Sequence, residues 1–244
     1  HQHPASAGCF FINILTESTS NMNQTHLDLV YIGCKMNSMI DQSQTSDEQR
    51  GQLPIVVLAS SSPRRQEMLS DAGINHRVQP AGIDDGELVA GSLSSADHWV
   101  VSLAYLKATS SSRMLSSSEL GLDLAQGESV VVVGADTVCV HEGKIIGQPE
   151  DRDHAREIIM EMRDATHEVL TGVALLDPFS DRRELFVDRS VVTVGDIADD
   201  EIEAYLDSGL WKGKAGAYNI TERLAAGWPI EFSGDESSIV GLPL

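Results

Sequence analysis

The fold class follows from the stretch Ile55-Val56-Val57-Leu58-Ala59-Ser60-Ser61-Ser62-Pro63-Arg64-Arg65. Its apolar first half predicts a buried β-strand, and the serines that follow predict the end of that strand. Proline is tolerated at the first position of a helix, so a helix is expected to begin at Pro63. A strand that leads directly into a helix is the building unit of α/β folds, and this is the fold class that we predict.

The start of this helix has the features of an anion-binding site. Backbone N–H groups at a helix start favour negative charge, and arginine offers forked donors that match phosphate oxygens. The first turn of a helix usually prefers Asp or Glu, whereas this one carries Arg64 and Arg65. The alternative interpretation is an exposed helix whose arginines are simply solvated.

The composition narrows the classes of partner. The chain has 244 residues and a formal net charge of −20, with 17 Lys and Arg in total. Nucleic-acid polymers and anionic membranes need a positive field, so neither is an expected partner. A phosphate-bearing substrate would need a local basic pocket. The candidate cations for such a pocket are Arg64, Arg65, Lys107, Lys144, Lys212 and Lys214.

Residues 1–52 and residues 53–244 differ in composition and in hydrophobic pattern. Residues 1–52 are rich in Ser, Thr, Asn and Gln with little apolar periodicity, and we expect them to form a disordered extension. Residues 53–244 alternate apolar runs with amphipathic stretches and form the predicted folded domain. The three cysteines show no zinc or disulfide spacing, and no segment has the pattern of a membrane span, so a cytoplasmic location is expected.

A coarse order of elements follows from the same patterns. We expect a continuous buried strand at 130–133, because four consecutive valines are typical of a strand covered on both faces. The other expected elements are a strand at 55–59, a helix at 63–72, a strand at 76–79, a helix at 97–114 capped by Asp97, a hairpin at 138–146, a helix at 151–163, strands at 167–176 and 184–194, a helix at 199–207 and short strands through 228–242.

Asp136 is the strongest candidate for catalysis. It follows the valine run, and ligands of open α/β sheets gather at the carboxyl ends of strands, where a carboxylate can hold a divalent cation or act as a base. A helix-capping role is the alternative, although the residues after it look like a strand. The acidic loop that contains Asp85 is a second, weaker source of carboxylates. Together they predict a magnesium site, since Mg²⁺ binds one or two carboxylates plus substrate phosphates.

Two lysines complete the candidate set. Lys107 falls on the apolar stripe of its predicted helix, where a cation needs an anionic partner, unless its stem lets the ammonium reach solvent. Lys214 begins Lys214-Ala215-Gly216-Ala217-Tyr218, a turn of small residues suited to close approach of a ligand. The alternative for this segment is a structural turn with a packed tyrosine. The sequence contains no Walker loop, HExxH or GxSxG motif.

Five segments together resemble, in order and spacing, the Maf family of nucleoside triphosphate pyrophosphatases over residues 53–244. The segments are Leu58-Ala59-Ser60-Ser61-Ser62-Pro63-Arg64-Arg65, Gly134-Ala135-Asp136-Thr137-Val138, Leu170-Thr171-Gly172-Val173-Ala174, Lys214-Ala215-Gly216-Ala217-Tyr218 and Ile239-Val240-Gly241-Leu242-Pro243-Leu244. The resemblance implies a mixed, elongated sheet flanked by helices, with a cleft between two lobes, as in the inosine triphosphate pyrophosphatases. It also implies hydrolysis of the bond between the α and β phosphates of a nucleoside triphosphate.

The resemblance further implies roles for individual residues. Asp136 matches the proposed general base, and Asp85 stands where the family usually has Glu in an acidic pair that shares a divalent metal, Mg²⁺ or Mn²⁺. The phosphate-contacting positions are matched by Ser60, Arg64, Arg65 and Lys107. The homodimers common in the family make a homodimer an expected assembly, although the sequence shows no interface.

The tyrosine-containing segment looks more like the branch that acts on dTTP and UTP, and Arg64 and Thr137 match its specificity positions. Two positions depart from that pattern. Gln148 stands where Lys is common, and Thr221 stands where Gln is common, so the contact of this predicted substrate-binding residue to the base is expected to differ. Two other functions stay open at this point: hydrolysis of modified nucleotides, or nucleotide binding that regulates cell division with little catalysis.

Overall fold

The computed structural model describes residues 54–83, 95–116 and 129–244. The predicted extension at 1–52 and the acidic residue Asp85 lie outside the described residues. Within those three segments, no helix is long and apolar enough to cross a membrane.

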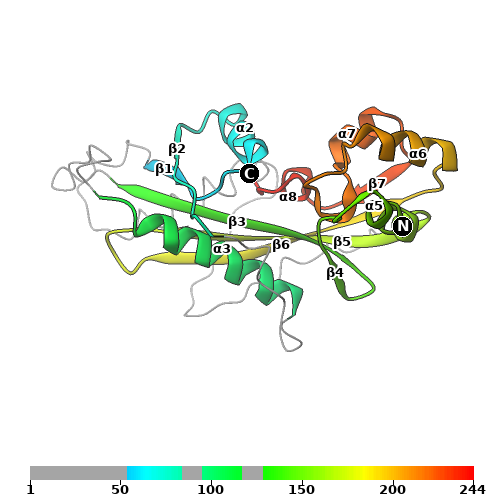
Figure 1. Ribbon diagram of the computed structural model, residues 1–244. Coiled ribbons are helices and arrows are strands. Elements are labelled where there is room, and N and C mark those ends of the chain that lie inside the picture. The colour runs from blue at the N-terminus through cyan, green and yellow to red at the C-terminus, as the bar shows by residue number, and fades with distance from the viewer. Residues whose placement is uncertain (1–53, 84–94, 117–128) are drawn as a thin grey trace, which may run out of the picture.

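The centre of the structure is one mixed sheet with strand order β2-β1-β3-β5-β6-β7, to which β4 adds by pairing with β3 (Figure 1). The strands β2, β1 and β3 are parallel, and all other pairs are antiparallel. The mixed α/β sheet predicted from the sequence is therefore confirmed. The strands are β1 Ile55–Leu58, β2 His76–Val78, β3 Val130–His141, β4 Lys144–Ile146, β5 Ala165–Leu176, β6 Arg183–Val194 and β7 Ile230–Ser233.

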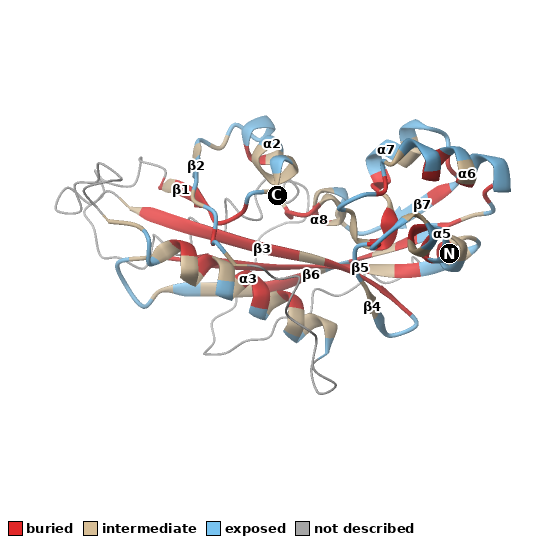
Figure 2. Cartoon of the chain, in the orientation of Figure 1, coloured by how far each residue is buried: buried red, intermediate tan, exposed pale blue. Residues whose placement is uncertain are grey.

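Strand β3 is longer than the sequence pattern suggested. The valine run does not end at Gly134, because β3 continues to His141 and pairs with β5 from Val132 opposite Leu176 to Val140 opposite Glu168. Figure 2 shows β3 buried over most of its length. The predicted strand end was wrong because an antiparallel partner satisfies the backbone through the Gly-Ala-Asp-Thr segment. Asp136 consequently lies within a strand, but beyond the end of β1, whose last residue pairs with Val133.

Helices cover both faces of the sheet. Helix α3 lies on one face, while α2, α6, α7 and α8 lie on the other, and α5 packs against α6 (Figure 1). The helices are α2 Pro63–Asp71, α3 Ala96–Ser112, α5 Arg152–Met162, α6 Asp199–Ser208, the 3₁₀ turn η4 Ala215–Ala217, α7 Ile220–Ala225 and α8 Glu236–Val240. The cap of α3 is Ser95, whose hydroxyl accepts from the N–H of His98, and the expected cap Asp97 lies in the first turn.

Two glycines bring α3 unusually close to the sheet. A Cβ atom on Gly134 would lie 2.2 Å from the carbonyl oxygen of Ala104, and one on Gly172 would lie 2.5 Å from the carbonyl carbon of Val100. No residue with a side chain fits at either position without a shift of backbone. The glycines in β3 and β5 therefore set the height of α3 above the sheet.

Separate apolar clusters lie at the two ends of the sheet. One cluster packs α2 onto the sheet around Leu58, Leu69 and Leu175, all of which are fully buried. Another packs the helices at the opposite end around residues such as Ile202 and Trp228. The long strands β3, β5 and β6 join the two ends (Figure 1). The result is two lobes on a shared sheet.

Helix α8 lies where the sequence predicted short strands. Its N-cap is Asp235, whose side chain accepts from the N–H of Ser237 at 2.8 Å, and Gly241 with φ of 132° follows its last residue. These local signals favour one short helix over an extended segment. The short strand predicted for 239–242 was therefore wrong, and α8 instead lies between the two lobes.

Candidate active site

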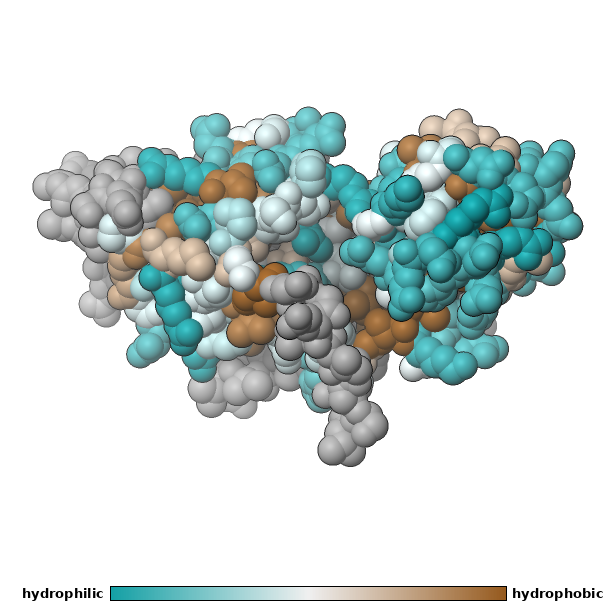
Figure 3. All heavy atoms as spheres, viewed as in Figure 1, coloured by the Kyte–Doolittle hydropathy of each residue, from teal (hydrophilic) through white to brown (hydrophobic). Residues whose placement is uncertain are grey.

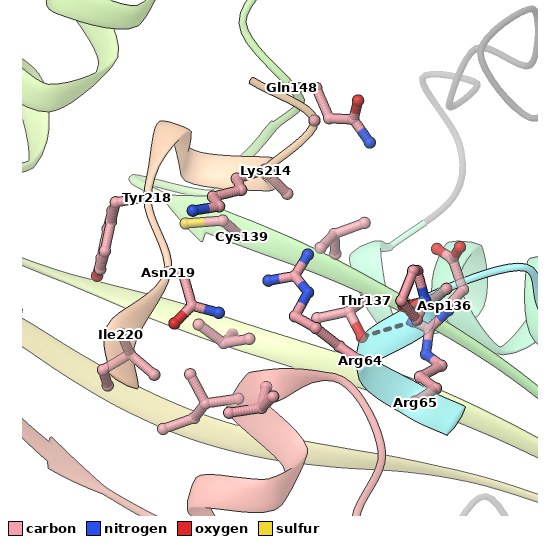
Figure 4. A pocket seen from close by; sticks show the side chains of 18 of the residues that line it. Arg64, Arg65, Asp136, Thr137, Cys139, Gln148, Lys214, Tyr218, Asn219 and Ile220 are labelled. Carbon is pink, nitrogen blue, oxygen red and sulfur yellow. Dashed lines mark hydrogen bonds between the residues drawn. The ribbon is translucent and has the colours of Figure 1, made fainter. Parts of the chain in front are cut away.

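A cavity of about 400 Å³ lies between the two lobes, and Figure 3 shows the surface hollowed there. Its walls come from segments far apart in the chain (Figure 4). The lining side chains that carry charge or hydrogen-bonding groups are Ser61, Ser62, Arg64, Arg65, Lys107, Asp136, Thr137, Cys139, Gln148, His167, Lys214, Tyr218 and Asn219. A volume of this size is within the usual range for small-molecule sites.

Asp136 and Lys107 form an ion pair at the base of the cavity. Lys107 Nζ donates to Asp136 Oδ1 at 2.7 Å, and the two side chains are 14% and 10% exposed. The low exposure excludes the interpretation in which Lys107 reaches bulk solvent. Asp136 is also no helix cap, since it lies within β3. The close approach of α3 permitted by the glycines is what allows its lysine to reach a carboxylate in the sheet.

The two arginines of α2 differ in their contacts. Arg65 is held by three protein acceptors. Its Nε donates to the carbonyl oxygen of Gly241 at 2.8 Å. Its Nη1 donates to Ser60 Oγ at 3.3 Å, and its Nη2 donates to Thr137 Oγ1 at 3.1 Å. Arg64 lines the cavity and makes no hydrogen bond or ion pair with any other described residue. Its guanidinium points into the cavity in Figure 4. Arg64 therefore offers its guanidinium to a ligand, whereas Arg65, which also lines the cavity, donates to three protein acceptors.

A chain of hydrogen bonds connects Arg65 to α8. Thr171 Oγ1 donates to the carbonyl of Ser238, so the 2.8 Å bond between the two threonine hydroxyls uses the proton of Thr137. Thr137 then accepts from Arg65. Because each hydroxyl has a single proton, every donor direction in this chain is fixed, and Thr137 can offer a ligand only a remaining lone pair. Ser60 also serves this network, because it accepts from Arg65 and lies outside the cavity lining.

The opposite wall is the turn before α7. Gly216 and Ala217 both have positive φ, 71° and 64°, and this turn carries Lys214 and Tyr218 to the cavity. Lys214 Nζ donates to Glu222 Oε2 at 2.5 Å, and the lysine side chain is 12% exposed. The small-residue turn predicted from the sequence is therefore present, and its cation lines the cavity.

His167 was missed in the sequence analysis. It is 2% exposed, lines the cavity from β5, and its Nε2 is 2.9 Å from the Tyr218 hydroxyl. Burial, with a smaller contribution from His141, lowers the pKa of His167 to about 4, and burial raises the pKa of Tyr218 above its usual range. Both side chains are therefore neutral near pH 7. The available signal was the alternation in β5, which places residue 167 on the face shared by 169 and 171.

Asn219 and Cys139 also line the cavity, although the sequence did not predict either of them as a site residue. Asn219 is 7% exposed and caps α7, and Cys139 is 4% exposed, with burial raising the pKa of its thiol to about 12. Thr221, the predicted base contact, is exposed on α7 and does not line the cavity. Gln148 does line it, but without the charge of a lysine.

Among the described residues, the cavity offers a divalent metal few carboxylate ligands. Asp136 is the single acid among the residues that line the cavity, and no cluster of three or more His, Cys, Asp or Glu suited to a metal occurs in the described segments. One carboxylate fits a hard cation that takes its other ligands from water and substrate phosphates. The predicted partner Asp85 lies outside the described residues.

Comparison with known proteins places this fold and cavity in a family. The model of the family described as "Maf-like protein" matches residues 55–244. The chain belongs to the Maf family. The segments that carried the resemblance contribute Arg64, Asp136 and Lys214 to one cavity.

Curated Maf relatives include a dTTP/UTP pyrophosphatase of Salinibacter ruber, 37% identical over 78% of this chain and 85% of the relative. A dTTP/UTP pyrophosphatase of Pelotomaculum thermopropionicum is 36% identical, over 78% of this chain and 91% of the relative. A third relative of the same name, from Rhodopirellula baltica, is 35% identical over 78% of this chain and 77% of its own length.

Proposed function

We propose that this protein is a nucleoside triphosphate pyrophosphatase that acts on dTTP and UTP. The observation that carries the proposal is that one carboxylate and several cationic side chains line the same cavity. Relatives named for this activity support it. Arg64 and Lys214 line the cavity from opposite walls, and Asp136 lies on the far side of Arg64 from Lys214 in Figure 4. This distribution suits a polyphosphate near a group that can handle a proton.

In the proposed reaction, water adds across the α–β phosphoanhydride and yields the nucleoside monophosphate and pyrophosphate. Asp136 orients the attacking water and accepts its proton, while Arg64 neutralises charge on the phosphates as the pyrophosphate leaves. Lys107 holds the carboxylate of Asp136 in place through the 2.7 Å ion pair. Arg65 lines the same cavity as a predicted phosphate contact, and its described hydrogen bonds also hold Thr137 and the end of α8 in place.

We also propose a divalent cation, Mg²⁺ or Mn²⁺, as the cofactor. Asp136 would hold it together with phosphate oxygens of the substrate, and the expected second carboxylate is Asp85. When bound, such a cation neutralises the charge of the triphosphate and of the leaving pyrophosphate. The carboxylate of Asp136 supplies the oxygen ligand that hard cations such as Mg²⁺ and Mn²⁺ prefer, which supports this choice.

The substitution Asp136→Asn tests this assignment. It keeps the shape of the side chain and an acceptor for Lys107, but it removes the proton acceptor, so we expect turnover of UTP to fall about 10²- to 10⁴-fold. Steady-state release of pyrophosphate measures the loss, and circular dichroism reports on the fold. Asp207→Asn, at an exposed position on α6, is the matched control and should keep full activity. Near-normal pyrophosphate release by Asp136→Asn would defeat the assignment.

A further inference from the structure

The side-chain amide of Asn219 has a fixed orientation. Its Oδ1 accepts from the backbone N–H of Glu222 at 3.0 Å, as the N-cap of α7. An N–H donor can be accepted only by the oxygen of the amide, so the reverse placement of oxygen and nitrogen is excluded. The Nδ2 group, with two N–H donors, must therefore point away from α7.

Those two donors are directed into the cavity. Asn219 is 7% exposed and lines the cavity, and its Nδ2 has no hydrogen-bond partner among the described residues. In Figure 4 the nitrogen lies on the side of Asn219 that faces Arg64. A nearly buried amide whose donors open on a cavity is suited to an acceptor on a ligand, because a ligand that covers these donors without accepting from them leaves them unpaired at a cost.

The surroundings of Asn219 indicate which part of a ligand would lie there. Tyr218 and Ile220 flank it in the chain and line the cavity, and Ile239 and Val240 of α8 also line it. These aromatic and aliphatic side chains suit a flat, weakly polar ring, whereas Arg64 and the carboxylate of Asp136 suit the phosphates. If the proposed function holds, the ring is the nucleobase of the substrate.

We propose that Asn219 is a specificity-determining residue that donates a hydrogen bond to the carbonyl oxygen at position 4 of uracil or thymine. Uracil and thymine share that acceptor, whereas cytosine carries an amino group there, which would place donor against donor. A site with an unpaired buried donor rejects the mismatched ligand more strongly than a merely apolar site does. The residue thus supplies a physical reason for a preference for keto pyrimidines.

The proposal rests on the proposed function, so its test measures binding separately from turnover. Analogues of UTP and CTP with a methylene group in place of the α–β bridging oxygen are titrated calorimetrically in the presence of Mg²⁺. We expect the protein to bind the UTP analogue about 10- to 100-fold more tightly than the CTP analogue. The quantity compared is the dissociation constant of the CTP analogue divided by that of the UTP analogue. Because both analogues carry the same triphosphate, this ratio is insensitive to effects on phosphate binding.

Two variants change the donor and keep the helix cap. Asn219→Asp retains an oxygen for the N–H of Glu222 but replaces the donors with an acceptor, so the ratio should fall below one in favour of CTP. Asn219→Ser retains a capping oxygen on a shorter side chain, so the ratio should approach one. The control is Asn75→Asp, the same amide-to-carboxylate change at an exposed position outside the cavity lining, which should leave the ratio unchanged.

The outcomes separate the two proposals. Equal binding of both analogues by the natural protein, or an unchanged ratio in both Asn219 variants, would overturn the role of Asn219 and leave the pyrophosphatase activity standing. A preference for the UTP analogue that Asn219→Asp reverses, in a protein that hydrolyses neither UTP nor dTTP, would support the base contact and contradict the pyrophosphatase activity.

Discussion

Arg64 and Arg65 are neighbours in the sequence, yet the structure gives them different roles. Both are helix-start arginines by pattern, and the sequence predicts the same phosphate contact for each. The side chain of Arg65 bridges the segment after β1, strand β3 and the end of α8 through Ser60, Thr137 and Gly241. Arg64, in contrast, points its guanidinium into the cavity (Figure 4).

Substitution of each arginine by methionine should therefore give opposite results. Arg64→Met should raise the KM for UTP about 10- to 100-fold with little change in Tm, because a ligand contact is lost and no described protein contact is broken. Arg65→Met should lower the free energy of unfolding by about 1–3 kcal/mol, since the carbonyl of Gly241 and two hydroxyls lose a charged donor. Initial rates and thermal unfolding of both variants measure the difference. Equal KM effects with unchanged stability would contradict the distinction.

His167, which lines the cavity, makes the stability of the protein depend on pH. Burial keeps its imidazole neutral and lowers its pKa to about 4, below the 6.5 of an exposed histidine. Between these two values the unfolded chain binds a proton that the folded protein does not, so stability falls as the pH drops from 6.5 to 4. The loss attributable to His167 is on the order of 3 kcal/mol.

The contribution is isolated by the neutral substitution His167→Asn. Urea unfolding at pH 7 and pH 4.5 should show a smaller loss of stability in this variant than in the natural protein. His98→Asn, at an exposed position on α3, should retain the natural pH dependence. A His167→Asn protein that loses as much stability on acidification as the natural one would show that His167 is not the titrating group.

At the scale of elements, the placement of α3 depends on two residues of the sheet. Gly134 and Gly172 leave room for the backbone of the helix, and that proximity places Lys107 against Asp136. Gly172→Ala would bring a methyl group to 2.5 Å from the carbonyl carbon of Val100, so the helix must shift. We expect a loss of about 1–3 kcal/mol in the free energy of unfolding and a reduced turnover.

Chemical denaturation and UTP turnover of Gly172→Ala measure both effects. Gly147→Ala is the matched control, because no atom lies within 4 Å of the Cβ that it would add. Its stability and activity should match those of the natural protein. If Gly172→Ala were as stable and as active as Gly147→Ala, the close approach of α3 would not be what positions Lys107.

The sequence predicts elements well where local signals suffice. The helix that begins at Pro63, the hairpin after His141 and the helix expected at 151–163 all lie close to where the local pattern places them. The extent of β3 was not predictable in this way, because its continuation beyond Gly134 is stabilised by pairing with β5, a strand that is distant in the sequence. The short helix α8 was missed because its two apolar residues, Ile239 and Val240, are too few to distinguish a helix from a strand by periodicity.

At the scale of the whole molecule, the cavity exists because the sheet carries a lobe at each end. Arg64 belongs to one lobe and Lys214 to the other, and Asp136 lies on the strand that connects them. Their meeting could be predicted from the family resemblance but not from spacing alone. The orientations of Asn219 and His167 could not, because they depend on a helix cap and on a hydrogen bond to Tyr218.

The most direct test of the proposed activity is the identity of the products formed from UTP and dTTP. Phosphorus NMR of the reaction of the full chain with either nucleotide and Mg²⁺ resolves every phosphate species. The account predicts equal amounts of nucleoside monophosphate and pyrophosphate, formed about 10²- to 10⁴-fold more slowly with Asp136→Asn. Formation of the nucleoside diphosphate and inorganic phosphate, or an unchanged nucleotide with the natural protein, would contradict it.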